Sequence, residues 1–220
     1  MTLMMIYRPL LEYFGPQNWW PMQRGFRPPE WEVCLGAVLT QNTNWSNVEK
    51  ALSNLKASGI ISKQDILRLG ENELAELIKP SGYYNQKAKK LRILASFNGK
   101  VTRNNLLSLW GIGRETADSI LLYAYNKPYF VIDAYTRRIF SRLGLVQKDS
   151  SYEELRHFFE RNIPRDTAIY KEYHALIVEL GKRFCRKKPL CNECPISHFC
   201  ESAPSGDRDE CRSRKFPKHR

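Results

Sequence analysis

The chain has 220 residues, 42% of them hydrophobic, which is enough for one or two compact domains with a core. Its 35 lysines and arginines outnumber its 23 acidic residues, and the formal net charge of +12 favours a polyanionic partner over an acidic metabolite, with nucleic acid first and an anionic membrane surface second. No stretch approaches the roughly 18 uncharged apolar residues of a membrane span, and the N-terminal segment lacks a signal peptide's basic start and cleavage site, so we expect a cytoplasmic protein.

Apolar residues recur at helical spacing along most of the chain. The segment 33–41, VCLGAVLTQ, is typical of a central buried helix because it is apolar all round. Helical spacing continues through 48–55, 74–78, 88–95, 117–124, 139–143, 155–159 and 173–184. Only PYFVID, 128–133, resembles a strand, and it is short enough to be an extended connector. The sequence therefore predicts an all-α fold.

Two sequence patterns indicate helix starts. Ser46 with Glu49, and Ser151 with Glu154, fit the capping box, in which two side chains satisfy the amides at the first turn. Both patterns predict that the first turn of a helix is stabilised, and neither predicts a function. The last segment, 204–220, has little to bury and is rich in charge, so we expect a loose basic tail there.

The stretch LWGIGRETADSI, 109–120, places two glycines between two apolar helical segments. A helix, a tight turn and a second helix would present backbone amides to an anion. Gly111 and Gly113 would permit backbone angles closed to other residues and the close approach of a phosphate. On this stretch alone, an ordinary helix end followed by a new helix is the simpler interpretation.

Four of the six cysteines crowd into the segment 185–200. In a reducing compartment this clustering indicates a metal site and argues against disulfides. Four thiolates this close suit tetrahedral zinc or an iron–sulfur cluster. The spacing lacks the two separated CxxC pairs of a zinc ribbon, which favours a 4Fe–4S cluster and leaves zinc as the alternative. The predicted ligands are Cys185, Cys191, Cys194 and Cys200.

Several motifs occur in the order of a known family. LWGIGRETADSILLYAYNKPYFVIDAYTRRIFSRLG, 109–144, resembles the helix-hairpin-helix, Gly/Pro-rich loop and aspartate of the endonuclease III superfamily of DNA glycosylases. LGAVLTQNT, 35–43, and GYYNQKAKKL, 82–91, resemble two further segments of that family. The cysteines are similar to those of its iron–sulfur branch, although the first gap between them is one residue shorter than the commonest pattern.

The resemblance implies a two-domain helix-hairpin-helix glycosylase fold. A six-helix barrel domain would span 29–127, and a domain of terminal helices carrying the cluster would combine 1–28 with 128–203. The family binds double-stranded DNA across the cleft between these domains and flips the damaged nucleotide out, because its glycosidic bond cannot be reached inside the stack. We accordingly expect a monomer associated with the nucleoid.

The family's motifs also imply roles for single residues. Asp133 stands at the catalytic aspartate, where a carboxylate stabilises the cationic sugar and orients the attacking water, although sequence alone would favour a helix N-cap. Gln41 stands where the family inserts a glutamine into the gap that the flipped nucleotide leaves, and a polar helix end is its alternative. The implied DNA contacts are Gln41, Gly111, Ile112, Gly113 and Arg114.

Family members that also cut the strand carry a lysine two residues after the hairpin's last glycine, where it forms a Schiff base with the sugar. This chain has Glu115 at that place. Since a carboxylate forms no imine, the resemblance implies a monofunctional glycosylase that leaves an abasic site. Arg114 and Lys127 are nearby cations, and neither is predicted to be the nucleophile.

Within the superfamily, the pattern WWP…LGAVLTQNT…SGYYNQKAKKL…GIGRETAD is most similar to the 3-methyladenine DNA glycosylase III branch, which lacks the cysteine cluster. This similarity implies an alkylated purine substrate, whose positive charge would suit the aromatic faces of Trp19, Trp20 and Trp45. Core packing is the alternative role for these tryptophans. Two other functions stay open: an endonuclease III-like glycosylase and lyase for oxidised or mismatched pyrimidines, and a non-catalytic DNA-binding protein.

Overall fold

The computed structural model describes residues 2–213, which form helices and contain no strand, so the predicted all-α fold is confirmed. The chain divides into two compact units, Met1–Trp19 with Pro128–Arg220, and Trp20–Lys127. The first boundary was expected after residue 28. It lies after Trp19 because the following segment packs on the second unit, where Gln23 Nε2 donates to Glu49 O over 2.9 Å. Within residues 2–213, no helix is both long enough and apolar enough to cross a membrane.

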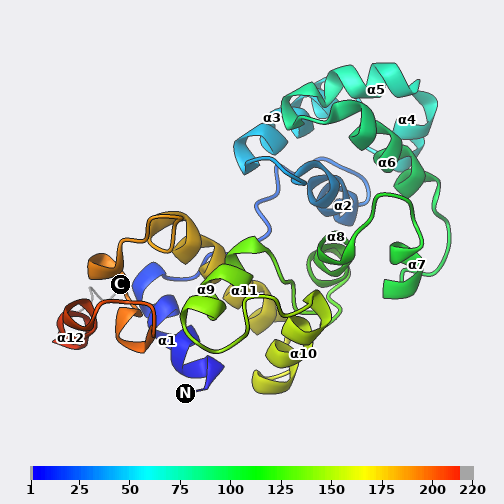
Figure 1. The fold of residues 1–220 in the computed structure, drawn as a ribbon. Coiled ribbons are helices and arrows are strands. Elements are labelled where there is room, and N and C mark those ends of the chain that lie inside the picture. The colour runs from blue at the N-terminus through cyan, green and yellow to red at the C-terminus, as the bar shows by residue number, and fades with distance from the viewer. Residues whose placement is uncertain (1, 214–220) are drawn as a thin grey trace. The chain divides into compact units, whose positions relative to one another are not determined.

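The unit Trp20–Lys127 is built around α2 (Pro29–Leu39), which contacts four other helices of the unit, named below as α3, α6, α8 and η2 (Figure 1). Every residue of α2 from Trp31 to Leu39 is buried, as the apolar sequence predicts. The remaining elements are α3 (Trp45–Ala57), α4 (Lys63–Arg68), α5 (Glu71–Leu77), η1 (Lys79–Ser81), α6 (Tyr84–Ser96), α7 (Arg103–Leu107), α8 (Arg114–Ser119) and the π-helix η2 (Ile120–Ala124).

Only one of the two predicted capping boxes forms. Ser151 accepts from Glu154 N–H and Glu154 bonds back, as predicted. The box at Ser46 is wrong because α3 begins two residues earlier in register, with Asn44 as its N-cap accepting from a backbone amide. Glu49 instead accepts from the indole N–H at the start of α3. A polar N-cap candidate just upstream therefore displaced the predicted one.

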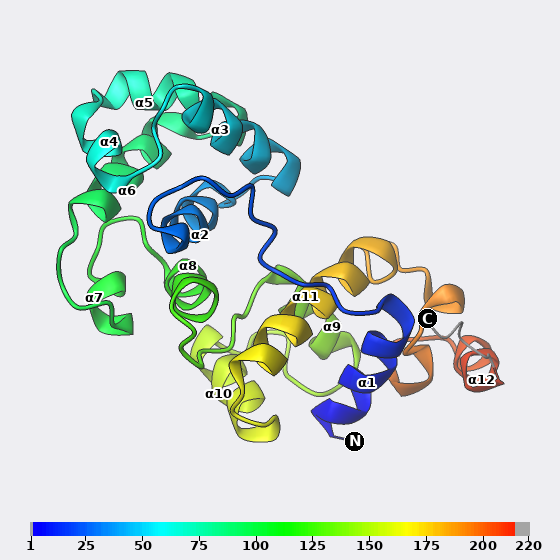
Figure 2. The same ribbon diagram turned by 180° about the vertical axis from the view of Figure 1, so that it is seen from behind.

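The unit formed by the two ends of the chain packs around α11 (Thr167–Arg183), which contacts both α1 (Leu3–Phe14) and α9 (Ala134–Arg142) (Figure 2). Its core is aromatic: the Phe130 and Phe159 rings stack with centroids 4.3 Å apart. The Tyr173 hydroxyl donates to Leu3 O over 2.8 Å and ties α1 to α11. The remaining helix of this core is α10 (Tyr152–Asn162). Residues 128–133 form the extended connector expected from their sequence.

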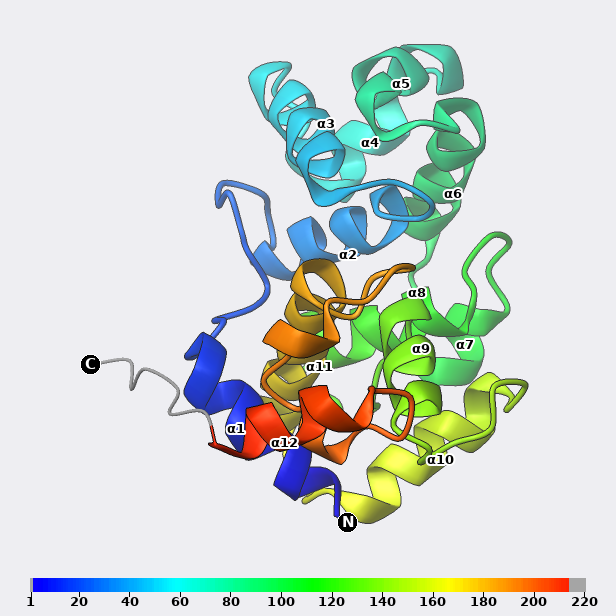
Figure 3. The ribbon, with the colours of Figure 1, turned by 60° about the vertical axis from the view of Figure 1, so that its left-hand side comes forward.

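The segment after the cysteines differs from the expected loose tail. Residues Ser205–Ser213 form α12, which contacts the short helices η3 (Cys191–Glu193) and η4 (Ser197–Phe199) of the cysteine loop (Figure 3). Cys211 is buried, and Ser197 Oγ donates to Asp207 O over 3.1 Å. Polar composition misled the prediction because one buried cysteine and backbone contacts suffice to dock this helix. Residues 214–220 lie outside the described part of the chain.

Candidate nucleic-acid interface and active site

The turn between α7 and α8 has the geometry that its glycines predict. Gly111 has a φ of 81°, and a Cβ there would lie 2.5 Å from the Lys90 side chain, so both the backbone angle and the packing require glycine. Ile112 is buried and its N–H donates within the turn over 3.1 Å, so it anchors the hairpin. Gly113 and Arg114 are exposed at the start of α8. Ile112 thus supports the turn from inside, with its side chain packed in the core and its amide bonded within the turn.

A buried ion pair clamps the two helices of the hairpin together. Arg103 at the start of α7 donates through Nε to Asp118 Oδ1 over 2.7 Å and through the terminal nitrogen to Oδ2 over 3.0 Å. The Asp118 side chain is fully buried and that of Arg103 is 14% exposed. Such a two-bond pair fixes both distance and angle between the helices. No sequence pattern indicates it, because the partners are 15 residues apart on different helices.

Gln41 lies beside this hairpin with its side-chain amide fully engaged. Its Nε2 donates to Gly111 O over 3.3 Å and to Thr116 Oγ1 over 2.9 Å. Its Oε1 accepts from Lys90 Nζ over 2.6 Å, and burial lowers the pKa of Lys90. Insertion of Gln41 into DNA requires these partners to be exchanged, and that role stays a prediction.

A buried lysine fixes the segment that leads to Gln41. Lys87 on α6 is 1% exposed, and its Nζ donates to Leu39 O over 2.8 Å and to Ser81 O over 2.6 Å. Burial, reinforced by the charge of Lys90, lowers the pKa of Lys87 to about 8. The ammonium therefore joins the end of α2 to η1. Sequence reasoning missed this role, although a lysine between the apolar positions of α6 indicates one.

Two of the three predicted pocket tryptophans form one aromatic group. The Trp20 ring centroid lies 5.2 Å from that of Trp45 and 5.0 Å from that of Tyr123. Gly36 makes room for the group, since a Cβ there would lie 3.0 Å from the Trp20 ring. Tyr123 belongs to the π-helix η2, a distortion often found at functional sites. Sequence reasoning missed Tyr123 because its position continues an ordinary apolar helix face.

Trp19, the third predicted pocket tryptophan, belongs to the other compact unit. Its ring meets the His174 ring edge-on with centroids 5.8 Å apart, and Lys182 Nζ lies 5.8 Å from its centroid. The structure therefore groups Trp19 with α11 and groups Trp20 with Trp45 in the second unit.

Asp133 is the N-cap of α9, and its two carboxylate oxygens have different partners. Oδ1 accepts from Thr136 N over 2.7 Å and from Thr136 Oγ1 over 2.8 Å. Oδ2 lies 3.6 Å from His174 Nε2, and the side chains of Asp133 and His174 are only 11% and 7% exposed. Burial by itself raises the pKa of Asp133, but the His174 imidazole and the Thr136 hydrogen bonds outweigh it and hold that pKa below its usual value. The site thus combines the N-cap with a buried, ionised carboxylate.

Glu115 is exposed in the first turn of α8, two residues after Gly113. A carboxylate is favoured at this end of a helix because the backbone amides point toward it. The same carboxylate has no nitrogen with which to attack a sugar aldehyde. Glu115 therefore suits the helix and does not supply an amine nucleophile.

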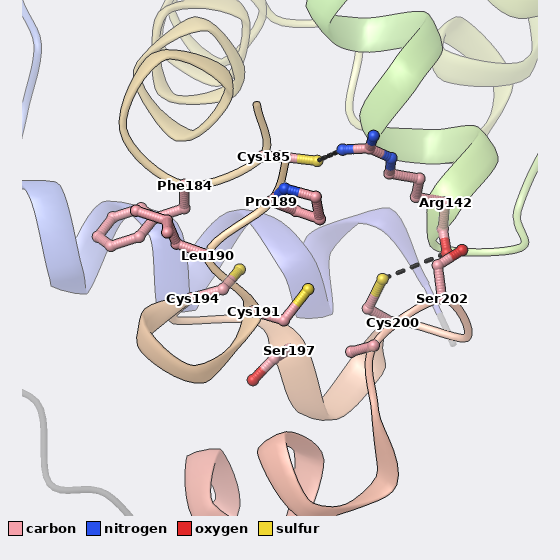
Figure 4. Close-up of a pocket in the computed structure, with 11 residues that line it drawn as sticks. Arg142, Phe184, Cys185, Pro189, Leu190, Cys191, Cys194, Ser197, Cys200 and Ser202 are labelled. Atoms are coloured by element: carbon pink, nitrogen blue, oxygen red, sulfur yellow. Dashed lines mark hydrogen bonds between the residues drawn. The ribbon is translucent and has the colours of Figure 1, made fainter. Parts of the chain in front are cut away.

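The four clustered cysteines line one cavity of about 190 Å³ (Figure 4). Arg142 on α9 donates to Cys185 Sγ over 3.3 Å, and Cys200 Sγ donates to the Arg142 carbonyl over 3.2 Å. Burial raises the pKa of Cys194 to about 12, and it also raises the pKa values of Cys191 and Cys200. Four thiols on one small, largely apolar cavity fit the donor set of zinc or an iron–sulfur cluster.

Among the described residues, no group of three or more His, Cys, Asp or Glu side chains is arranged to hold a metal ion. Binding of a metal or cluster would release the protons of the thiols that ligate it, because the thiolate is the ligand. The fifth nearby cysteine, Cys211 on α12, is buried, whereas the other four are partly exposed, and its Sγ lies 3.2 Å from His198 Nδ1. It does not line the cavity.

Comparison with known proteins bears on this arrangement. The model of the HhH-GPD superfamily of base excision DNA repair proteins matches residues 35–165, a range that holds the hairpin, Gln41 and Asp133. The chain belongs to this family. It is 49% identical over 213 residues, 90% of this chain and 94% of the relative, to a Methanocaldococcus jannaschii protein that carries the provisional name DNA repair glycosylase MJ1434. It is 34% identical over 190 residues, 83% of this chain and 87% of the relative, to endonuclease III of Thermotoga maritima.

Two solved structures are similar to the fold of this chain. The 3-methyladenine DNA glycosylase MagIII of H. pylori bound to 1,N6-ethenoadenine superposes with a TM-score of 0.71 at 33% identity, covering 82% of this chain and 96% of that one. A non-covalent endonuclease III–DNA complex superposes with a TM-score of 0.79 at 22% identity, covering 96% and 97%. This HhH-GPD protein is thus a DNA glycosylase of base excision repair, and the resemblance to the endonuclease III superfamily is confirmed.

Proposed function

We propose that this glycosylase removes alkylated purines of the 3-methyladenine type from double-stranded DNA and leaves an abasic site. The observation that carries the substrate class is the aromatic group of Trp20, Trp45 and Tyr123 around Gly36. Electron-rich ring faces attract a positively charged alkylated base more strongly than a neutral one. The similarity to MagIII, solved with 1,N6-ethenoadenine, supports the same class.

The chemistry assigned to this chain is hydrolysis. The ionised Asp133 would stabilise the positive charge that develops on the sugar as the base leaves, and would orient the attacking water. Thr136 fixes one carboxylate oxygen, and His174 faces the other. Because Glu115 holds the place of the family's lysine, strand cleavage through a Schiff base is not part of the proposal.

The DNA contacts follow the hairpin. Gly111, Gly113 and Arg114 would bind a phosphate of the DNA backbone, and Gln41 would leave Lys90 and Thr116 to fill the gap beside the flipped nucleotide. Ile112 would support the turn from inside. The protein is proposed to act as a cytoplasmic, nucleoid-associated monomer.

The cysteine loop is proposed to hold a 4Fe–4S cluster, with zinc as the alternative. Cys185, Cys191, Cys194 and Cys200 would be its ligands, since all four line one cavity. When bound, the cluster would fasten a loop with few apolar residues of its own. Lysines and arginines beside the first ligand would then present charge to DNA.

The test is a lesion panel. Duplexes carrying 3-methyladenine, 7-methylguanine, hypoxanthine, thymine glycol or a T:G mismatch are incubated with the protein and analysed with and without alkali. We expect strand breaks on methylated purines only after alkali. Release of oxidised or mismatched pyrimidines with cleavage before alkali would replace this proposal by the endonuclease III-like one, and binding without release from any substrate would leave a DNA-binding protein.

A further inference from the structure

Trp110, directly before the hairpin glycines, is left in solvent by the fold. The side chain is 51% exposed, although it carries one of the largest apolar surfaces in the chain. Two apolar neighbours in the hairpin are buried instead: Ile112 in the turn is 4% exposed and Leu106 on α7 is 1% exposed. Packing of the hairpin therefore does not account for an indole at this position.

The surroundings of the exposed ring are positively charged. Lys89 Nζ lies 4.8 Å from the Trp110 ring centroid, within the range of a cation–π contact. Lys90, the next residue on α6, packs beside Gly111, and Arg114 is exposed on α8. One cation, Lys89, thus lies over the aromatic plane, and Lys90 packs beside the adjoining turn that would bind phosphate. Charge complementarity favours a polyanion with flat, apolar groups, which describes a nucleic acid strand.

We infer that Trp110 and Lys89 form a contact site for an unpaired base of DNA: the indole stacks on the base while Lys89 binds the adjoining phosphate. Lys89 covers one face of the ring, so the base would pack against the other. A base inside an intact duplex has both faces covered by its neighbours. The contact is therefore available at single-stranded or unstacked positions, and it tolerates any sequence because every base has a π-face.

This site goes beyond recognition of the damaged base and rests only on the DNA-binding part of the proposed function. The site formed by Trp110 and Lys89 predicts two separable contributions to the affinity for single-stranded DNA. Stacking by Trp110 depends little on salt, whereas each phosphate contact by a lysine adds about 0.7 to the slope of log K against log salt on single strands. The two residues can thus be told apart by one type of measurement.

The experiment measures binding of a labelled, undamaged single-stranded oligonucleotide and of the duplex of the same sequence by anisotropy over a range of salt concentrations. We expect Trp110→Ala to weaken single-strand binding about tenfold at every salt concentration, with an unchanged slope and a much smaller effect on the duplex. Trp110→Phe should keep most of the affinity because it keeps an aromatic face. Lys89→Gln should lower the slope by about 0.7.

Leu67→Ala is the matched control, because Leu67 is another exposed apolar side chain of the same unit, 40% exposed on α4. Thermal unfolding of each variant checks that the fold is intact. Wild-type affinity of Trp110→Ala for single strands, or an equal loss on the duplex, would overturn the inference. Undamaged DNA needs no base release, so failure of the glycosylase proposal would appear in the lesion panel and leave this measurement unaffected.

Discussion

Asp133 Oδ2 lies 3.6 Å from His174 Nε2, while Asp133 Oδ1 accepts both hydrogen bonds from Thr136. The carboxylate is therefore held from two sides: α9 fixes one oxygen and α11 supplies a basic neighbour for the other. With both side chains nearly buried, a charged form of Asp133 depends on these partners. This relationship gives the proposed catalytic group a defined orientation and a defined charge.

Asp133→Asn and Asp133→Ala should separate the capping role from the catalytic one. Asparagine caps helices as well as aspartate does, so Asp133→Asn should keep the bond to Thr136 N, bind DNA and unfold near the wild-type temperature. Its base release should fall at least about a hundredfold, because the charge that stabilises the sugar cation is gone. Asp133→Ala should lose base release and also the N-cap, and the lost cap should lower the free energy of unfolding by about 1 kcal/mol. Single-turnover base release and thermal unfolding check both variants, and substantial activity in Asp133→Asn would remove Asp133 from the mechanism.

His174→Gln should move the acid limb of the activity profile. Since the pKa of Asp133 is held below 3.8, its carboxylate in the wild type stays ionised throughout the mildly acidic range. Loss of the imidazole should raise that pKa, so base release in the variant should begin to fall at a higher pH than in the wild type. The same lowered pKa contributes folding stability above pH 3.8, and this contribution is lost as the pH falls through the folded-state value.

The readout is the pH dependence of single-turnover base release for wild type and variant, with thermal unfolding measured at the same pH values. Tyr173→Phe is the companion variant on the same turn of α11: it removes a hydroxyl bonded to Leu3 O and should change stability without moving the pH profile. Identical acid limbs in wild type and His174→Gln would show that His174 does not set the charge of Asp133.

Helical spacing was sufficient to predict the fold class, because each buried face repeats along its own helix. The apolar run 33–41 predicted α2, and the short run 128–133 was recognised as a connector. Docking of α12 could not be predicted, since it depends on Cys211 and on backbone contacts that only the folded cysteine loop provides. The predicted start of α3 was wrong for a local reason. Asn and Ser are both good N-cap residues, and the choice between Asn44 and Ser46 depends on how the helix packs.

Glu115→Lys should create a Schiff-base reaction that we expect the wild type not to perform. Borohydride reduction of wild-type protein on DNA with an abasic site should trap no covalent adduct, because Glu115 has no amine. A lysine introduced at this place should yield a trapped adduct on a denaturing gel. Glu115→Gln is the control and should behave as the wild type does. An adduct with wild-type protein would identify another amine of this chain as a nucleophile and contradict the monofunctional assignment.

Asp118→Asn should loosen the hairpin. It leaves the Arg103 guanidinium, with a side chain only 14% exposed, beside a neutral amide, and breaking such a pair typically costs about 3 kcal/mol of unfolding free energy. Affinity for undamaged duplex should fall as well, because α7 and α8 no longer hold the turn at a fixed angle. Chemical denaturation and anisotropy measure the two effects. Glu76→Gln breaks an exposed pair with Lys79 and should leave both quantities unchanged.

Only part of the candidate site could be predicted from the sequence. Gln41 belongs to one motif, 35–43, and Asp133 and the glycines belong to another, 109–144, so these positions could be proposed from short continuous stretches of sequence. The involvement of His174 and Tyr123 could not be predicted, because each lies on an apolar helix face where such a side chain is expected to be part of the core. Their roles depend on contacts with Asp133 and with Trp20, which are far from them in sequence.

The cysteines offer a built-in control for the proposed metal site. Cys191→Ser and Cys194→Ser each remove a thiol that lines the cavity, and purified variants should lose most of their bound iron and sulfide together with visible absorption. Cys211→Ser alters a nearby cysteine that is more deeply buried than either of these and does not line the cavity, and it should keep the metal. Metal analysis distinguishes the two candidate metals, because zinc without sulfide would replace the iron–sulfur assignment. Equal metal loss in all three variants would mean that the loop's packing, and not ligation by these two thiols, retains the metal.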